Sequence, residues 1–181
     1  MTTLISSNQW LNPEISVTDG NRLTTFHIQD CLNFHGYDAV GGVVLGFRLL
    51  QAVQQHLNQG QPLDRRALSL YTAFPGLGAR DVFELITRMC SENRFELDLG
   101  ISHPVALKAV AGAFYFKFSY QGGSVELSPI EGAPSADFIA IGKASKDPNA
   151  TAELLERWVG LKYDLANTLL QHTADQVIRK L

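Results

Sequence analysis

The chain has 181 residues, 45% of them hydrophobic and 18% charged, a balance typical of a globular protein rather than a disordered one. Its formal net charge is −3 and its basic residues form no stripe, which argues against binding to nucleic acid or to an anionic membrane surface. No segment reaches the roughly 20 apolar residues that span a bilayer, and residues 1–10 lack the features of a signal peptide. The two cysteines form no Cys-x-x-Cys pair, so we expect reduced, buried thiols in a cytoplasmic protein.

Residues 1–25 are polar and contain turn signals, so they predict an N-terminal arm with at most one short helix. A strand is expected at Leu23–Ile28. Apolar residues then recur at steps of three and four, and this spacing predicts a helix over residues 39–58. Asp38 is placed to cap the first amides of that helix.

The predicted helix at 39–58 is unusual because it contains Gly41, Gly42 and Gly46. A glycine inside a helix costs up to about 1 kcal/mol relative to alanine. Gly42 and Gly46 are one turn apart, so another backbone could approach that face closely. Packing is the favoured reason, and access for a ligand is the alternative.

The middle and the end of the chain continue with alternating strands and amphipathic helices. Phe114, Phe116 and Phe118 alternate with polar residues and are expected to face the core. Gln121-Gly-Gly123 has the composition of a hairpin turn. Strands are predicted at 66–73, 94–99, 113–120, 124–128 and 137–142, and helices at 79–91 and 151–172, the latter with a short continuation toward Leu181 left open.

This order of elements predicts an α+β fold with a mainly antiparallel, mixed sheet. The sheet is expected to pack against the glycine-rich N-terminal helix, a middle helix and a long C-terminal helix. There is no repeat or linker, so residues 1–181 are read as a single domain with residues 1–25 as its arm.

The first candidate site precedes the glycine-rich helix. Cys31 and His35 are four residues apart, a spacing that places both side chains on one face of a helical turn. A thiolate and an imidazole are good ligands for zinc, and Asp38 could add a carboxylate. The alternative is that His35 is a structural residue that forms hydrogen bonds near a helix end.

Residues from Phe34 to Arg48 read Phe-His-Gly-Tyr-Asp-Ala-Val-Gly-Gly-Val-Val-Leu-Gly-Phe-Arg. This segment resembles the opening motif of the formylmethanofuran dehydrogenase E-like domain, which typically reads Phe-His-Gly-His, then Cys-Pro-Gly, then a helix with Gly-x-Arg. The residues that match in type and approximate spacing are Phe34, His35, Gly36, Gly41 or Gly42, Gly46 and Arg48. The resemblance covers about the first third of the chain well and the middle only loosely. It implies an α+β fold, a homodimer and, in some members, a bound divalent metal.

The chain departs from the family pattern at the positions that would hold a metal. Tyr37 replaces the second histidine, and Ala39-Val40 replaces the Cys-Pro pair. The resemblance therefore implies a small-ligand or divalent-metal-binding domain whose metal site is reduced to His35, Cys31 and Asp38. Zinc is the first metal expected there.

The second candidate site is Phe74-Pro-Gly-Leu-Gly-Ala-Arg-Asp81, where a strand ends and a helix begins. Free amides at a helix N-terminus attract anions, and Arg80 could bind a carboxylate or a phosphate. We therefore expect a small anionic ligand at Gly76, Gly78 and Arg80, with Tyr37 close by. The alternative is that Pro75 and the glycines only form the turn.

No nucleophile elbow, zinc-protease motif or dinucleotide fingerprint is present in the sequence, so no specific reaction is predicted. If chemistry occurs, Cys31 or His35 is the expected reactive group. His103 is expected to face solvent, and the alternative is that it lines the same cleft. Two non-catalytic hypotheses remain: a homodimeric scaffold joined through the glycine-rich and C-terminal helices, and an accessory subunit of a larger oxidoreductase.

Overall fold

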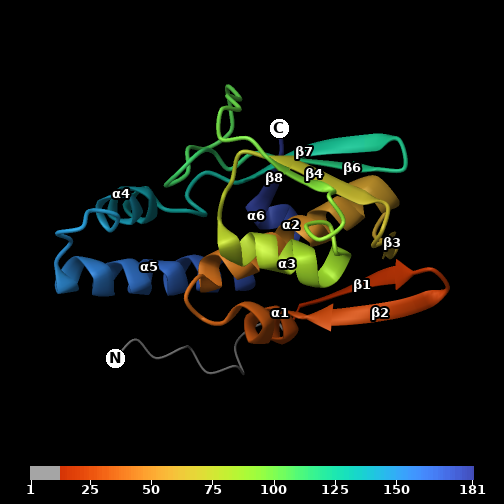
Figure 1. The fold of residues 1–181 in the computed structure, drawn as a ribbon, viewed down its shortest axis with the longest axis horizontal. Coiled ribbons are helices and arrows are strands. Elements are labelled where there is room, and N and C mark those ends of the chain that lie inside the picture. Colours follow the sequence, from red (N-terminus) through yellow and green to blue (C-terminus); the bar gives the residue numbers. More distant parts are fainter. Residues whose placement is uncertain (1–12) are drawn as a thin grey trace.

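The computed structural model describes residues 13–181, and within them the chain forms an α+β fold (Figure 1). The elements are β1 (Glu14–Asp19), β2 (Arg22–His27), α1 (Ile28–His35), α2 (Val40–Asn58), β3 (Leu63–Asp64), β4 (Leu68–Thr72), α3 (Leu77–Thr87), β5 (Phe95–Leu97), β6 (Phe116–Tyr120), β7 (Gly123–Pro129), α4 (Ala136–Ala144), α5 (Ala152–Leu170), α6 (Ala174–Val177) and β8 (Ile178–Lys180). No helix within these residues combines the length and the apolar character needed to cross a membrane.

The strands form two mixed sheets. A three-stranded sheet has the order β2-β1-β3, and a five-stranded sheet has the order β5-β4-β6-β7-β8. Each contains one parallel pair, β1 with β3 and β4 with β5, and the other pairs are antiparallel. The predicted α+β class is thereby confirmed.

Helix α2 is the centre of the core and is buried on almost every side. It packs against α3, α5 and α1, and against the inner face of the larger sheet (Figure 1). That face carries Phe116 and Phe118, which are fully buried, and Phe114 just before β6 is also buried. The three phenylalanines therefore form part of the core, as the alternation predicted.

The glycines of α2 allow neighbouring helices to approach its backbone. A Cβ added to Gly46 would lie 2.8 Å from the Ala79 Cα of α3, and one added to Gly41 would lie 2.9 Å from the Lys162 carbonyl oxygen of α5. Gly42 also faces the first turn of α3. The packing interpretation is confirmed for Gly41 and Gly46, whereas the contacts of Gly42 are ordinary ones at 3.6 Å and leave access for a ligand open. Because this face is used inside the chain, it is not available as the subunit interface that the sequence suggested, and the homodimer itself stays a prediction.

The N-terminal arm predicted for residues 1–25 is wrong where the structure describes it, because residues 14–27 form the β1–β2 hairpin. Ile15 and Val17 are buried and alternate with more exposed residues, the pattern of a strand with one face on the core. Gly20 provides the left-handed turn at a φ of 59°. The rest of the predicted arm, residues 1–12, lies outside the described residues.

Two further local predictions are wrong, and the continuation beyond residue 172 that the sequence left open is decided. Residues 137–142 belong to helix α4, not to a strand, because the Ser135 hydroxyl accepts a hydrogen bond from the Phe138 amide and starts a helix. The chain beyond α5 does not continue as one helix: α6 is a single turn, and β8 then pairs with β7. Asp38 does not cap α2, whose N-cap residue is Ala39 and has no side-chain cap hydrogen bond.

Candidate functional site

The two candidate segments of the sequence meet in space through His35 and Asp81. His35 is the last residue of α1, and its Nδ1 lies 2.6 Å from the Asp81 Oδ2 of α3. The His35 side chain is only 10% exposed, whereas that of Asp81 is 39% exposed. This contact joins α1 to α3. The sequence pointed to His35 but gave no signal that Asp81 is its partner.

The three predicted metal ligands do not form a ligand set. Cys31 is buried in the core, and burial together with the Asp30 charge raises the pKa of its thiol to about 12, which keeps it protonated at neutral pH. His35 bonds to Asp81, and Asp38 is exposed. Within residues 13–181, no group of three or more His, Cys, Asp and Glu side chains is arranged to hold a metal ion. Zinc binding stays a prediction, and no step below depends on it.

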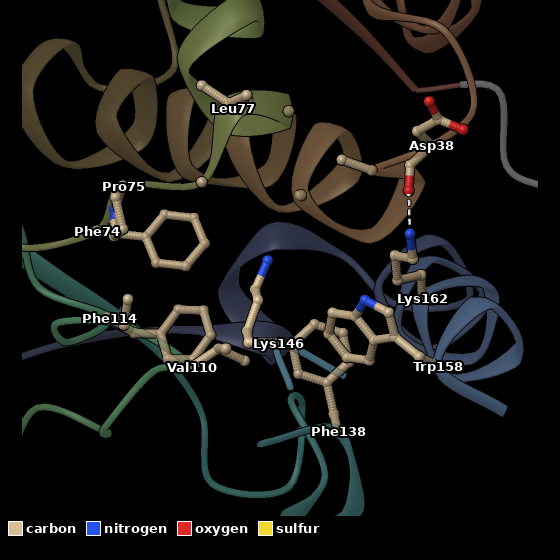
Figure 2. A pocket seen from close by; sticks show the side chains of 15 residues that line it. Asp38, Phe74, Pro75, Leu77, Val110, Phe114, Phe138, Lys146, Trp158 and Lys162 are labelled. Atoms are coloured by element: carbon tan, nitrogen blue, oxygen red, sulfur yellow. Dashed lines mark hydrogen bonds between the residues drawn. The ribbon is translucent and has the colours of Figure 1, made fainter. Parts of the chain in front are cut away.

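A pocket of about 320 Å³ lies beside these segments, where the first turns of α2 and α3 face α4 and α5 (Figure 2). Its volume is at the lower end of the range usual for small-molecule sites. Most of its lining is apolar. The lining residues are Asp38, Ala39, Gly42, Phe74, Pro75, Gly76, Leu77, Gly78, Val110, Ala111, Phe114, Phe138, Lys146, Trp158 and Lys162.

Two aromatic pairs form the apolar walls of this pocket. Phe74 stacks on Phe114 with ring centroids 4.8 Å apart, and Phe138 packs on Trp158 with centroids 4.7 Å apart. Gly142 makes the second pair possible, because a Cβ there would lie 2.8 Å from the Trp158 ring. The wall is thus fixed by α4 packing closely on α5.

Two lysines provide the polar part of the pocket. The Lys162 Nζ donates a hydrogen bond to the Asp38 carbonyl oxygen at 2.6 Å and lies 5.6 Å from the centroid of the Trp158 ring. Burial lowers the pKa of Lys162; the Asp38 carboxylate opposes this effect and the Lys146 ammonium adds to it. Lys146 points into the middle of the pocket (Figure 2), and its ammonium has no hydrogen-bond or ion-pair partner among residues 13–181.

The N-termini of α2 and α3 add to this positive potential. Neither N-cap residue, Ala39 or Gly76, makes a side-chain cap hydrogen bond, and neither helix has an acidic residue in its first turn. The amides at such helix ends carry partial positive charge. The Asp38 carboxylate points away from Lys162, which contacts the backbone carbonyl instead (Figure 2). The pocket therefore combines apolar walls with an excess of positive charge.

The structure divides the predicted ligand-binding residues into two groups. Gly76 and Gly78 line the pocket. Arg80 does not, because its side chain lies over the Phe95 ring, 5.8 Å from the centroid. Tyr37 is also outside the lining; it is 44% exposed, and its hydroxyl accepts a hydrogen bond from the Gln29 amide at 3.0 Å.

The sequence did not point to Lys146, Trp158 or Lys162 as ligand-binding residues. Trp158 and Lys162 are four residues apart on the predicted C-terminal helix, a spacing that puts them on one face. This was the only signal available for the pair. Lys146 is in the connection between α4 and α5, where sequence alone gives it no partner.

His103 differs from its expected position. Its ring stacks on Tyr115 with centroids 5.4 Å apart, and its side chain is only 23% exposed. The expectation that it faces solvent is therefore wrong. It lies on the outer side of the larger sheet, near Glu126, and does not line the pocket.

No protein-family model matches the chain, and neither a curated protein nor a solved structure matches it. The function is therefore inferred from the geometry and chemistry of the pocket.

Proposed function

We propose that this chain binds a small amphipathic anion, namely a carboxylate with an aromatic body, in the pocket between α2, α3, α4 and α5. The observation that carries the proposal is the ammonium of Lys146, which points without a partner into a cavity with aromatic walls. An anion is the ligand class that this charge and the two helix N-termini favour. Apolar walls favour a ligand with an apolar body over inorganic phosphate.

The two aromatic pairs in the pocket walls favour a ligand that itself has an aromatic ring. Phe114 and Trp158 lie on either side of Lys146 (Figure 2), so a ring held near either one keeps its carboxylate within reach of the ammonium. Offset or tilted aromatic contacts contribute about 0.5–1.5 kcal/mol beyond the burial of area. The proposal retains the small-ligand part of the sequence prediction and moves the anion site from Arg80 to Lys146.

Calorimetry and thermal unfolding with phenylacetate would test this proposal. We expect phenylacetate to raise the melting temperature in a concentration-dependent way, because a ligand that binds only the native state stabilises it. Phenylacetamide, which has the same body without the charge, should have little effect. Inorganic phosphate should also have little effect, because it has no apolar part.

The matched variants are Lys146→Gln and Lys143→Gln. Lys143 is also exposed and is in the last turn of α4, but it does not line the pocket. Loss of a charge-assisted hydrogen bond worth about 1.5–3 kcal/mol should weaken phenylacetate binding by about tenfold or more in Lys146→Gln. Lys143→Gln should bind as the unchanged protein does. Equal binding of phenylacetate and phenylacetamide, or equal loss in both variants, would contradict the proposal.

A further inference from the structure

Lys162, the second lysine of the pocket, has a chemical environment different from that of Lys146. Its ammonium is held against the Trp158 ring and the Asp38 carbonyl oxygen, so part of its contact with water is lost. Lys146 is exposed and supplies a second positive charge nearby. An amine that is desolvated in an apolar pocket beside another cation is the usual arrangement of a lysine that reacts with carbonyl groups.

We propose that Lys162 is an amine nucleophile that forms an imine with the carbonyl group of an aromatic 2-oxo acid whose carboxylate is held by Lys146. The inference rests on the proposed anion pocket and names the substrate class of that same site. A 2-oxo acid fits because its carbonyl carbon is next to its carboxylate. Both lysines line this pocket, and the proposal places them on neighbouring groups of one ligand whose ring contacts the aromatic pairs.

The reaction needs no partner besides the oxo acid. The lone pair of the neutral Lys162 Nζ forms a bond to the carbonyl carbon, and the π electrons of the carbonyl move to its oxygen. A proton passes from the nitrogen to that oxygen, which gives a carbinolamine. The nitrogen lone pair then forms the C=N bond as the C–O bond breaks, and the proton that remains on the nitrogen passes to the departing oxygen, which leaves as water.

The surroundings of Lys162 favour the neutral amine that this step requires. Burial is the main cause that lowers its pKa, the Asp38 carboxylate works in the opposite direction, and the Lys146 ammonium lowers it further. Each unit by which a pKa falls gives about tenfold more neutral amine at a pH well below that pKa. The hydrogen bond to the Asp38 carbonyl oxygen uses one N–H and leaves the lone pair of the neutral nitrogen free to react.

The experiment is reductive trapping of the full chain with phenylpyruvate and sodium borohydride, read by intact mass and peptide mapping. Hydride adds to the imine carbon, so a trapped lysine gains the mass of the oxo acid minus water plus two hydrogens. We expect one adduct, on Lys162, in preference by about tenfold over the exposed Lys143 and Lys180, because only the pocket holds the carboxylate through the Lys146 ammonium. Phenylacetate should compete with its formation.

Three variants sharpen the test. Lys162→Arg keeps the charge and a donor for the Asp38 carbonyl, so it should fold normally and give no adduct at this position. Lys146→Gln should need about tenfold more phenylpyruvate for the same yield, because it loses the charge that holds the carboxylate. Lys143→Gln should trap as the unchanged protein does. Melting temperatures confirm that each variant is folded.

The outcomes separate this inference from the proposed function. Binding of phenylacetate without a trapped adduct on Lys162 would overturn the imine and leave the anion pocket standing. Absence of both binding and trapping would overturn both. Equal labelling of Lys162, Lys143 and Lys180 would show ordinary surface reactivity and overturn the inference. Trapping on Lys162 that neither phenylacetate nor Lys146→Gln affects would overturn the role given to Lys146.

Discussion

Gly46 of α2 and Ala79 of α3 lie so close that a Cβ on the glycine would be 2.8 Å from the Ala79 Cα. The neighbour is backbone and cannot rotate away. We therefore expect Gly46→Ala to lower the free energy of unfolding by about 1–3 kcal/mol, the usual effect of overpacking, although alanine is the better helix former by about 1 kcal/mol. Urea-induced unfolding measures the change.

Gly160 of α5 provides the control for this variant. It is also inside a helix, but among residues 13–181 no atom beyond its chain neighbours and the backbone of its own helix lies within 4 Å of the position its Cβ would occupy. Gly160→Ala should therefore stabilise the protein by about 0.5–1 kcal/mol. A stabilising effect of the same size from Gly46→Ala would show that α2 and α3 do not approach each other as described.

Arg48 is a buried side chain that holds the end of α5 against α2. It is 4% exposed, and it donates to the carbonyl oxygens of Leu169 at 3.0 Å and Leu170 at 3.4 Å. Carbonyls at the end of a helix have no partner within the helix, and a cation there is favourable. Arg48→Met keeps much of the apolar volume but leaves these acceptors buried without the guanidinium. We expect it to lower the free energy of unfolding by about 1–3 kcal/mol.

The effect of Arg48→Met is best compared with Arg157→Met in the same denaturation assay. Arg157 is also associated with α5, and it pairs with Asp137 at 2.7 Å, but both side chains are more than half exposed. Exposed ion pairs contribute about 0–1 kcal/mol. Similar losses in the two variants would mean that the buried hydrogen bonds of Arg48 contribute no more than a surface pair.

The helical parts of the fold were predictable where a long apolar pattern has only one interpretation. Helix α2 follows from apolar residues that recur over five turns, and α5 follows in the same way. Residues 137–142 were misread because a short apolar run fits a strand or a helix equally well. The Ser135 cap and the packing of Gly142 on Trp158 favour the helix over the strand. The packing of Gly142 on Trp158 is a tertiary contact.

Of the candidate site, only the glycines at the start of α3 could be predicted from the sequence. Gly76 and Gly78 could be singled out because a strand ends and a helix begins around them. Lys162 of α5 and Lys146 of the connection before it reach the same pocket because α5 packs along α2, and no local pattern encodes that packing. The same reason explains why Asp81 was not expected as the partner of His35.

The contact between His35 and Asp81 should couple the two residues energetically. Their atoms are 2.6 Å apart, and His35 is mostly buried. We expect His35→Ala, Asp81→Ala and the double variant to give a coupling free energy of about 1–2 kcal/mol, within the range of contacting polar residues. A double-mutant cycle from urea unfolding measures it.

The control pair for that double-mutant cycle is His27 and Glu14. Their closest atoms are 4.0 Å apart, and the side chains are 44% and 66% exposed, so solvent weakens their interaction. A coupling for His35 and Asp81 no larger than that of this exposed pair would contradict the view that the contact anchors α1 on α3. Metal content should be measured on the same His35→Ala sample, because the zinc prediction also depends on this residue.

Cys31 should make the stability of the protein fall in alkaline solution. Burial and the Asp30 charge raise the pKa of its thiol from 9.0 to about 12. Below pH 9 the thiol is protonated in both the folded and the unfolded chain, so its contribution does not change. Between pH 9 and about 12 only the unfolded chain releases the proton, and folding loses up to about 1.4 kcal/mol per pH unit.

The Cys31→Ala variant isolates this effect from the other groups that titrate at high pH. The variant should be less stable than the unchanged protein at pH 7, because it leaves space in the core. Its free energy of unfolding should nevertheless fall less steeply between pH 8.5 and about 10.5. Cys90→Ala is the comparison: burial also raises the pKa of the Cys90 thiol, but Cys90 is only half-buried, so this variant should change the profile less than Cys31→Ala does. Parallel pH profiles for Cys31→Ala and the unchanged protein would show that the Cys31 thiol ionises as readily in the folded chain as in the unfolded one.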